Sequence, residues 1–247
     1  MISSILCYLI THTVGKYIKV LLVPSSGKSY FISQKLIIKC LNDAGRRVLV
    51  CRRWGSTVRE TVWQLTIEQL RFFQIEHLCQ INKTERTIVL PNGSTMIFIG
   101  LDDETKLLSL QNISDVWIEE AYEVTRDVAE QCSLRMRGLK ANQQIYLSFN
   151  PISASSWLFK FCEEDNPSSF IYHQSTFRDN KFLPPDYVAS LEDLYRTNPV
   201  KARVFCDGDW GVDFDGLVYP NHLIQDFDID ALLRDTSFPI KVGVDIG

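Results

Sequence analysis

The chain has 247 residues, of which 45% are hydrophobic and 23% charged, a composition typical of a globular protein with a buried core. This length suits one large α/β domain, or one domain and a fragment of another. The formal net charge of −4 excludes a protein that attracts nucleic acid by its overall charge, so any DNA contact has to come from local basic patches.

Apolar runs rich in β-forming residues alternate with helical patterns through the first hundred residues. The expected elements, in chain order, are a buried strand at 17–23, a helix from about Ser29 to Ala44, a strand at 46–52, a helix at 56–73 and a pair of strands at 86–100. The pair of strands is joined by a Pro-Asn-Gly turn, which is a hairpin signal.

The alternation continues to about Asp179 and then changes. The expected elements are a buried strand at 113–120, a helix at 124–138 that Gly138 ends, a strand at 144–151, two helices at 182–205 and a last apolar strand at 239–247. Between these helices and the last strand lies a stretch rich in glycine and aspartate that we interpret as a linker. Repeated apolar strands and helices predict a parallel sheet covered on both faces.

The cysteines and the N-terminus bear on location. Seven cysteines are scattered along the chain without a CxxC pair, which indicates a reducing cytosol rather than a disulfide framework. Residues 1–14 are apolar but lack the basic start and the cleavage site of a signal peptide. Because no run reaches the ~20 apolar residues that span a bilayer, we expect a soluble protein without a membrane partner.

The stretch VLLVPSSGKSYFIS places a Gly-Lys-Ser sequence between a strand and a helix. Backbone N–H groups at a helix N-terminus can cradle phosphates. Lys28 would then meet the β and γ phosphates, and the Ser29 hydroxyl would bind Mg²⁺. We therefore expect a nucleotide site formed by Ser26, Gly27, Lys28, Ser29 and Tyr30.

The run DVWIEEA predicts a buried strand that ends in two acids. A phosphate site with Mg²⁺ needs a carboxylate at the tip of a neighbouring strand, and hydrolysis needs an acid that positions water. Glu119 fits the metal side and Glu120 fits the water-orienting role. Two acids that begin a helix and favour its dipole are the structural alternative, but the pairing with SSGKS favours catalysis.

Two other strand ends carry polar side chains. Asn150, in LSFNP, would lie beside the lysine and the acids and could sense the γ-phosphate or the attacking water, although an Asn-Pro turn is a common structural feature. Arg52 and Arg53 lie just past the end of another strand, where they could face the phosphates. The basic runs CRRWGSTVR and LRMRGLK also fit solvated faces.

In this order, the segments resemble the large terminase subunit of tailed bacteriophages, the ATPase of the DNA-packaging motor, in its PBSX-like prophage branch. SSGKSYFISQ resembles its Walker A motif, VWIEEAYEVT its Walker B motif with the catalytic glutamate, and YLSFNP its coupling motif. QSTFRDNKFLP and GDWGVDFDGLVYP resemble further segments, and KVGVDIG resembles the first strand of its RNase H-like nuclease. The resemblance covers about residue 19 to the end and implies a RecA/ASCE-like P-loop NTPase fold.

The resemblance implies an ATPase that drives double-stranded DNA into a capsid in the host bacterial cytoplasm. Its partners would be the DNA, the small terminase subunit, the portal protein and other copies of the chain in a ring, and its cofactors would be ATP and Mg²⁺. By resemblance, Lys28 and Ser29 bind phosphate and Mg²⁺, Glu119 supports the metal, Glu120 is the catalytic acid and Asn150 couples hydrolysis to movement.

Three further residues take roles from the resemblance alone. SLRMRG is similar to the segment that supplies an arginine finger to a neighbouring subunit, which makes Arg135 and Arg137 candidates, although cations are favoured at any helix C-terminus. Asp245 matches the first metal-binding acid of the nuclease. Because a two-metal nuclease needs several carboxylates and the others would lie beyond Gly247, we expect no DNA cleavage. The implied domains are an ATPase domain at 1–206 with a helical segment at about 185–206, a linker at 207–239 and the first nuclease strand at 240–247.

The phosphate loop departs from the family pattern. Where the family has glycine-glycine-arginine-glycine, this chain has Leu22, Val23, Pro24 and Ser25. Glycine provides backbone angles that other residues resist, and Pro24 removes an N–H donor. The departure is compatible with nucleotide binding but argues against fast hydrolysis.

Two other interpretations stay open. One is another P-loop enzyme, a kinase or a helicase-like ATPase, although two acids followed by an asparagine favour a hydrolase. The other is a defective terminase fragment that binds nucleotide, DNA or terminase partners without turnover.

Overall fold

The computed structural model describes residues 17–22, 26–137, 140–165 and 170–211. All of these residues belong to the first of the two units of the chain, Met1–Val212. In this described part, none of the helices is both long enough and apolar enough to cross a membrane. The last expected strand, at 239–247, lies outside the described residues.

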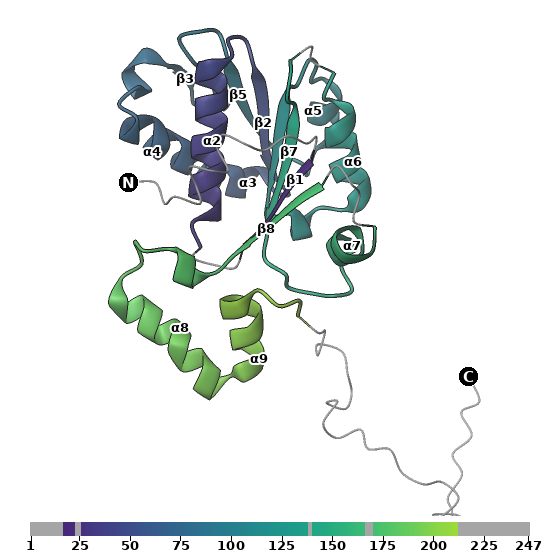
Figure 1. Cartoon of the computed structure of the whole chain (residues 1–247). Helices are drawn as coiled ribbons and strands as arrows, with labels where there is room; N and C mark the ends of the chain where they lie inside the picture. The colour runs from purple at the N-terminus through teal and green to yellow at the C-terminus, as the bar shows by residue number, and fades with distance from the viewer. Residues whose placement is uncertain (1–16, 23–25, 138–139, 166–169, 212–247) are drawn as a thin grey trace, which may run out of the picture. The chain divides into compact units, whose positions relative to one another are not determined.

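Among the described residues, eight strands form one sheet in the order β3-β4-β5-β2-β6-β7-β1-β8 (Figure 1). Neighbours from β5 to β8 pair in parallel, whereas β3, β4 and β5 are joined by antiparallel pairs. The mainly parallel sheet of the predicted fold is therefore confirmed. The strands are β1 (Tyr17–Leu22), β2 (Arg47–Arg52), β3 (Gln80–Asn82), β4 (Thr87–Val89), β5 (Thr95–Gly100), β6 (Asp115–Glu119), β7 (Gln144–Phe149) and β8 (Phe170–Ser175).

The helices begin and end at residues that satisfy their terminal backbone groups. Thr125 begins α6 because its side chain accepts a hydrogen bond from the Val128 N–H, and Pro185 begins α8 at a position where proline loses no hydrogen bond. The helices and helical turns are α2 (Lys28–Asn42), α3 (Gly55–Val58), η1 (Arg59–Trp63), α4 (Gln64–Phe72), η2 (Glu76–Leu78), α5 (Glu104–Leu108), η3 (Ala121–Glu123), α6 (Arg126–Leu134), α7 (Trp157–Phe159), η4 (Lys160–Glu164), η5 (Phe177–Asp179), α8 (Pro185–Thr197), α9 (Pro199–Ala202) and η6 (Arg203–Asp207).

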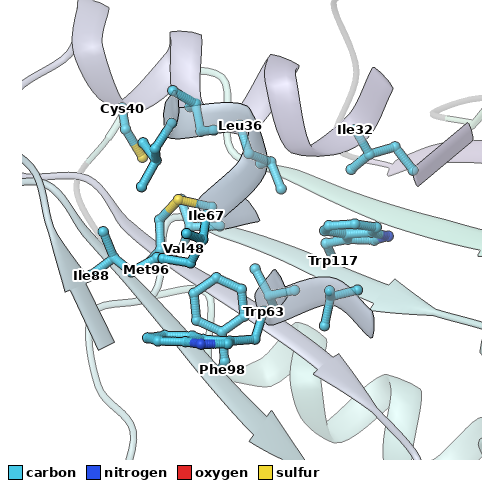
Figure 2. Packing of buried hydrophobic residues seen from close by; sticks show 14 of the residues in the cluster. Ile32, Leu36, Cys40, Val48, Trp63, Ile67, Ile88, Met96, Phe98 and Trp117 are labelled. Carbon is cyan, nitrogen blue, oxygen red and sulfur yellow. The ribbon is translucent and has the colours of Figure 1, made fainter. Parts of the chain in front are cut away.

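The sheet is buried on both faces because alternate residues of its central strands enter different cores. Val48 and Val50 of β2 pack with α2, η1 and α4 in the first core, and Leu49 and Cys51 pack with α5, α6 and η4 in the second. Figure 2 shows the first core, where the Trp63 and Phe98 rings meet edge to face at 5.1 Å. Each large apolar side chain buried in this way contributes about 1.5–3 kcal/mol of burial free energy.

The strand order brings distant segments together at one edge of the sheet. We call the edge where β1, β2, β6 and β7 end the carboxyl edge, and the opposite edge, where they begin, the amino edge. Strand β7 pairs with β1 on one side and with β6 on the other. Whatever follows β7 therefore lies between the loop after β1 and the acids at the end of β6, which is the position in which open α/β sheets bind ligands.

A smaller helical region follows β8. Its own core consists of Phe177, Leu191, Ala202 and Cys206, from η5, α8, α9 and η6. Residues 208–211, which the sequence assigns to a linker, pack on the loop after β7. Gly211 exchanges backbone hydrogen bonds of 2.8 Å with Pro151 and Ala154, and a Cβ at Gly211 would lie 1.9 Å from the Ile152 carbonyl oxygen. Only glycine fits this contact.

Some boundaries differ from those predicted. The sequence predicts that the helix at 124–138 continues to Gly138, but α6 ends at Leu134 because Arg135 and Met136 turn back to carbonyl groups three residues earlier. The helix predicted at 56–73 contains the π-turn η1. The hairpin at 86–100 is confirmed. The sequence did not predict β3, which has only three residues, or β8.

Candidate nucleotide-binding site

The loop after β1 ends at a helix N-terminus that is suited to an anion. Gly27 precedes α2 with φ 85°, a left-handed conformation that favours glycine. Within the described α2, the first turn carries no acidic side chain, so nothing there competes for its N–H groups. The first N–H groups of a helix have no intrahelical partners, and the macrodipole attracts negative charge. The backbone at Gly27, Lys28 and Ser29 is therefore suited to an anion.

Lys28 points toward the ends of two neighbouring strands. Its Nζ donates a 2.6 Å hydrogen bond to Asn150 Oδ1, directly after β7, and lies 3.5 Å from Glu120 Oε1, directly after β6. The side chain is buried, and burial lowers the pKa of Lys28 even though Glu120 and Glu119 act in the opposite direction. This lysine is therefore held at the centre of the carboxyl edge with its charge disfavoured by desolvation.

Glu119 supplies the carboxylate nearest the loop. Its Oε1 accepts a 2.9 Å hydrogen bond from the Ser29 hydroxyl. Burial and the neighbouring Glu120 raise the pKa of Glu119, while Arg52, Ser29 and Lys28 oppose that rise. A hydroxyl and a carboxylate oxygen are hard donors of the kind that Mg²⁺ prefers, so the pair fits a metal held jointly with a phosphate.

Glu120 has an unusual backbone conformation. Its φ of 50° and ψ of 54° lie in the left-handed region, which is rare for a residue other than glycine. Within the described residues, its buried Oε2 has no hydrogen-bond partner. A strained backbone that holds a carboxylate beside Lys28 is typical of a functional position.

A buried hydrogen bond fixes the relative position of β6 and β7. The Trp117 indole N–H donates to Ser148 Oγ at 2.8 Å, and these residues lie two positions before Glu119 and Asn150, respectively. Both side chains are buried. This contact holds Asn150 and Glu119 in register at the edge where they are needed.

Arg52, at the end of β2, faces the acids of the site. Its Nε lies 3.6 Å from Glu119 Oε2, and its Nη2 lies 3.3 Å from Glu123 Oε1. Arg53 turns elsewhere, with its guanidinium 5.2 Å from the centre of the Trp54 ring. Of the two arginines expected at this strand end, the structure brings only Arg52 to the acids.

Three further residues of the site were not expected from the sequence. The Thr61 hydroxyl, in η1, lies 3.5 Å from Glu119 Oε2. Glu123 contacts Arg52, and the amide nitrogen of Asn180 lies 3.9 Å from the position of a Cβ added at Gly27. Asn180 lies in QSTFRDNKFLP, a segment that resembles the family but to which the sequence assigns no role. Thr61 lies in a stretch whose only pattern is helical periodicity.

The remaining expected residues fall into different places. Within the described part of the chain, the buried Ser26 Oγ has no hydrogen-bond partner, while Tyr30 is exposed at the start of α2. Arg135 and Arg137 follow α6, which runs back from the end of β6 toward the start of β7, so they belong to the amino edge. Arg137 donates to the Leu134 carbonyl at 3.0 Å. Asp245 lies outside the described residues.

Comparisons with known proteins point to one family. The family profile for the phage terminase large subunit matches residues 18–209. The PBSX phage terminase large subunit of Bacillus subtilis (strain 168) is 27% identical over 242 residues, which cover 90% of this chain and 56% of that protein. This chain thus spans little more than half the length of that relative.

Solved structures show the same fold. The large terminase of a thermophilic bacteriophage in complex with ADP has a TM-score of 0.71 and 12% identity, over 85% of this chain and 54% of that one. The ATPase domain of the Thermus phage P74-26 large terminase has a TM-score of 0.60 and 14% identity, over 82% of this chain and 91% of that domain. The chain belongs to the phage terminase large subunit family and has the fold of its ATPase domain.

Proposed function

We propose that this chain binds ATP at the carboxyl edge and hydrolyses it as part of a phage DNA-packaging motor. The observation that carries the proposal is the convergence of one helix N-terminus with polar side chains from two neighbouring strands. Lys28 meets Asn150 and Glu120, and Ser29 meets Glu119. The large terminase that was solved in complex with ADP has the same fold, which supports a nucleotide site here.

Each side chain has a role that follows from its position. Ser29 and Glu119 would hold Mg²⁺, which when bound neutralises the charge on the transferring phosphoryl group. Lys28 and the N–H groups at the start of α2 would hold the phosphates. Glu120 would orient the attacking water and accept its proton. The strained backbone of Glu120, a cost of about 1–3 kcal/mol, suits a carboxylate that has to face the substrate.

Asn150 would report the state of the phosphate site. In the structure its Oδ1 accepts a hydrogen bond from Lys28, and phosphate oxygens would compete for the same ammonium group. The loop that Asn150 begins is also bonded to residues 208–211 through Pro151 and Gly211. A change in the Lys28–Asn150 hydrogen bond would therefore alter the position of residues 208–211 through these backbone bonds. This is expected of a residue that couples hydrolysis to movement.

The wider assembly belongs to the proposal. The chain would help to move double-stranded DNA through a portal into a capsid, as one of a ring of copies with a small terminase subunit in the host bacterial cytoplasm. Arg135 and Arg137 lie at the amino edge, so they would act on the nucleotide of a neighbouring copy rather than on their own.

The altered phosphate loop is the specific observation that favours a second function, nucleotide or partner binding without turnover. Leu22 is the last residue of β1, and the proline two residues later has no N–H to offer a phosphate. A loop with fewer donors would still leave Lys28 and the start of α2 for binding, but it would stabilise the transition state less.

ATP binding and turnover should be measured on the native chain, on Lys28→Ala and on a loop variant with Leu22→Gly and Pro24→Arg. Binding and turnover by the native chain that Lys28→Ala abolishes would support the proposal. Binding without turnover by the native chain, or binding only by the loop variant, would favour the second function. If none of the three proteins binds ATP, the assignment as an ATPase is wrong.

A further inference from the structure

The carboxyl edge holds more negative than positive side chains. Glu119, Glu120 and Glu123 follow one another within five residues, and the cations that contact them are Lys28 and Arg52. Carboxylates this close repel one another. The cations beside them therefore bear on how each carboxylate is held.

The two oxygens of Glu119 have different surroundings. Oε1 accepts the hydrogen bond from Ser29. Oε2 faces Thr61 Oγ1 at 3.5 Å and Arg52 Nε at 3.6 Å. The carboxylate is therefore oriented, with one oxygen toward the phosphate loop and the other toward the protein.

Arg52 is built into the fold at this position. It ends β2, which pairs with β6, and its side chain is only 13% exposed. Its Nη1 lies 3.5 Å from Thr61 Oγ1, and Thr61 donates to the Thr57 carbonyl at 2.7 Å, which ties the arrangement to the helical turn η1. Within the described residues, the buried Arg52 Nε has no hydrogen-bond partner, since 3.6 Å is too long for one. This N–H group can therefore still donate a hydrogen bond, and the carboxylate of Glu119 is the group that it faces.

We propose that Arg52 is a positioning residue for the metal-side carboxylate: its ion pair with Oε2 keeps Glu119 turned so that Oε1 faces Ser29 and a bound Mg²⁺. The inference rests on the proposed nucleotide site. Arg52 does not touch the reacting atoms in this arrangement, so it acts through Glu119.

The first experiment measures ADP affinity with and without Mg²⁺ at neutral pH for the native chain, Arg52→Gln, Arg52→Lys and the control Arg53→Gln. Arg52→Gln should reduce the gain in affinity that Mg²⁺ provides by about tenfold, the usual cost of losing a group that orients a metal ligand. Affinity without Mg²⁺ should change less than twofold. Arg52→Lys should restore part of the gain, and Arg53→Gln should match the native chain.

An equal loss of affinity with and without Mg²⁺ would overturn the proposal, because it would mean that Arg52 contacts the phosphates or only supports the fold. An unchanged Mg²⁺ gain in Arg52→Gln would overturn it as well. If the native chain binds no ADP, the proposed function fails, and a second measurement then decides on Arg52 by itself.

That second measurement is thermal unfolding of Arg52→Gln, Glu119→Gln and the double variant at pH 7, without nucleotide. Arg52→Gln should lower Tm by about 3–6 °C, because the buried Glu119 carboxylate then lacks its cation. Adding Glu119→Gln should restore most of that Tm. Additive effects would show that Arg52 and Glu119 are not coupled and would overturn the inference.

Discussion

Strand β6 carries a buried carboxylate at each end, and the two carboxylates differ in how closely their neighbours contact them. Asp115, at the amino edge, accepts hydrogen bonds from Lys39 Nζ at 2.5 Å, Arg46 Nη1 at 2.6 Å and the Gln144 backbone N–H at 3.2 Å. Glu119, at the carboxyl edge, has one close bond, from Ser29, and looser contacts at 3.5 and 3.6 Å.

The difference separates a structural charge from a functional one. Buried polar atoms that lack partners among the described residues gather near Glu119, on Ser26, Arg52, Glu120 and Glu123. At the amino edge such atoms occur on Arg135 and on Arg46, whose Nε still lies 3.1 Å from Asp43 Oδ2. A satisfied network holds strands in register, whereas unsatisfied groups retain capacity for a ligand.

The largest effect should come from comparing Lys28 and Lys39, two of the lysines of α2. Lys28→Ala should reduce ATP turnover by at least about 10²–10³-fold, the cost of removing one preorganised charge from a transition state. Unfolding should change little, because burial already disfavours the charge of Lys28. Steady-state turnover and calorimetry measure the two effects.

Lys39→Ala is the matched control for Lys28→Ala, at the other end of the same helix. It leaves Asp115 short of a partner, so it should lower stability while nucleotide affinity per folded molecule stays native. A loss of affinity in Lys39→Ala as large as in Lys28→Ala would contradict the division between the two edges.

The second comparison concerns the two carboxylates. Asp115→Asn should lower the free energy of unfolding by about 3–5 kcal/mol, since Lys39 and Arg46 lose the fully buried carboxylate that they share. Glu119→Gln should not lower stability at pH 7. The folded chain raises the pKa of Glu119, so its ionised form opposes folding at neutral pH and removal of the charge relieves that cost. Urea denaturation of both variants is the measurement, and equal losses would refute the contrast.

The third prediction is a pH window for nucleotide affinity. Metal binding needs ionised Glu119, and its raised pKa means that affinity falls on acidification at a higher pH than for an exposed glutamate. Phosphate binding needs charged Lys28, and its lowered pKa means that affinity falls on the alkaline side below the ordinary lysine value. Titration calorimetry of Mg²⁺–ADP across pH checks both limits, and in Glu119→Gln the acid limit should disappear.

The smallest expected effect concerns the backbone of Glu120. Glu120→Gly should raise stability by about 1 kcal/mol, because glycine adopts the left-handed conformation without strain. Glu120→Gln keeps the strain and should leave stability near the native value. Both variants should lose turnover, so a Glu120→Gly protein that is less stable than Glu120→Gln would show that the conformation is not strained.

The sequence by itself determined the elements and the identity of most of the site. Apolar periodicity located the strands that end at Arg52, Glu119 and Phe149, because burial on both faces of a parallel sheet imposes that pattern locally. The phosphate loop, the paired acids and Asn150 were predictable because each is a short run of suitable residues at the end of a strand.

Only the tertiary structure decided which of these ends meet. Strand β7 lies between β1 and β6, which brings Asn150 to Lys28 across 122 residues, and β2 beside β6 brings Arg52 to Glu119. Thr61 reaches Glu119 across 58 residues from a helical turn that showed only periodicity in the sequence. Strand order, and the contrast between Asp115 and Glu119, depend on pairing and packing between distant segments, and local hydrophobic patterns carry no information about that pairing.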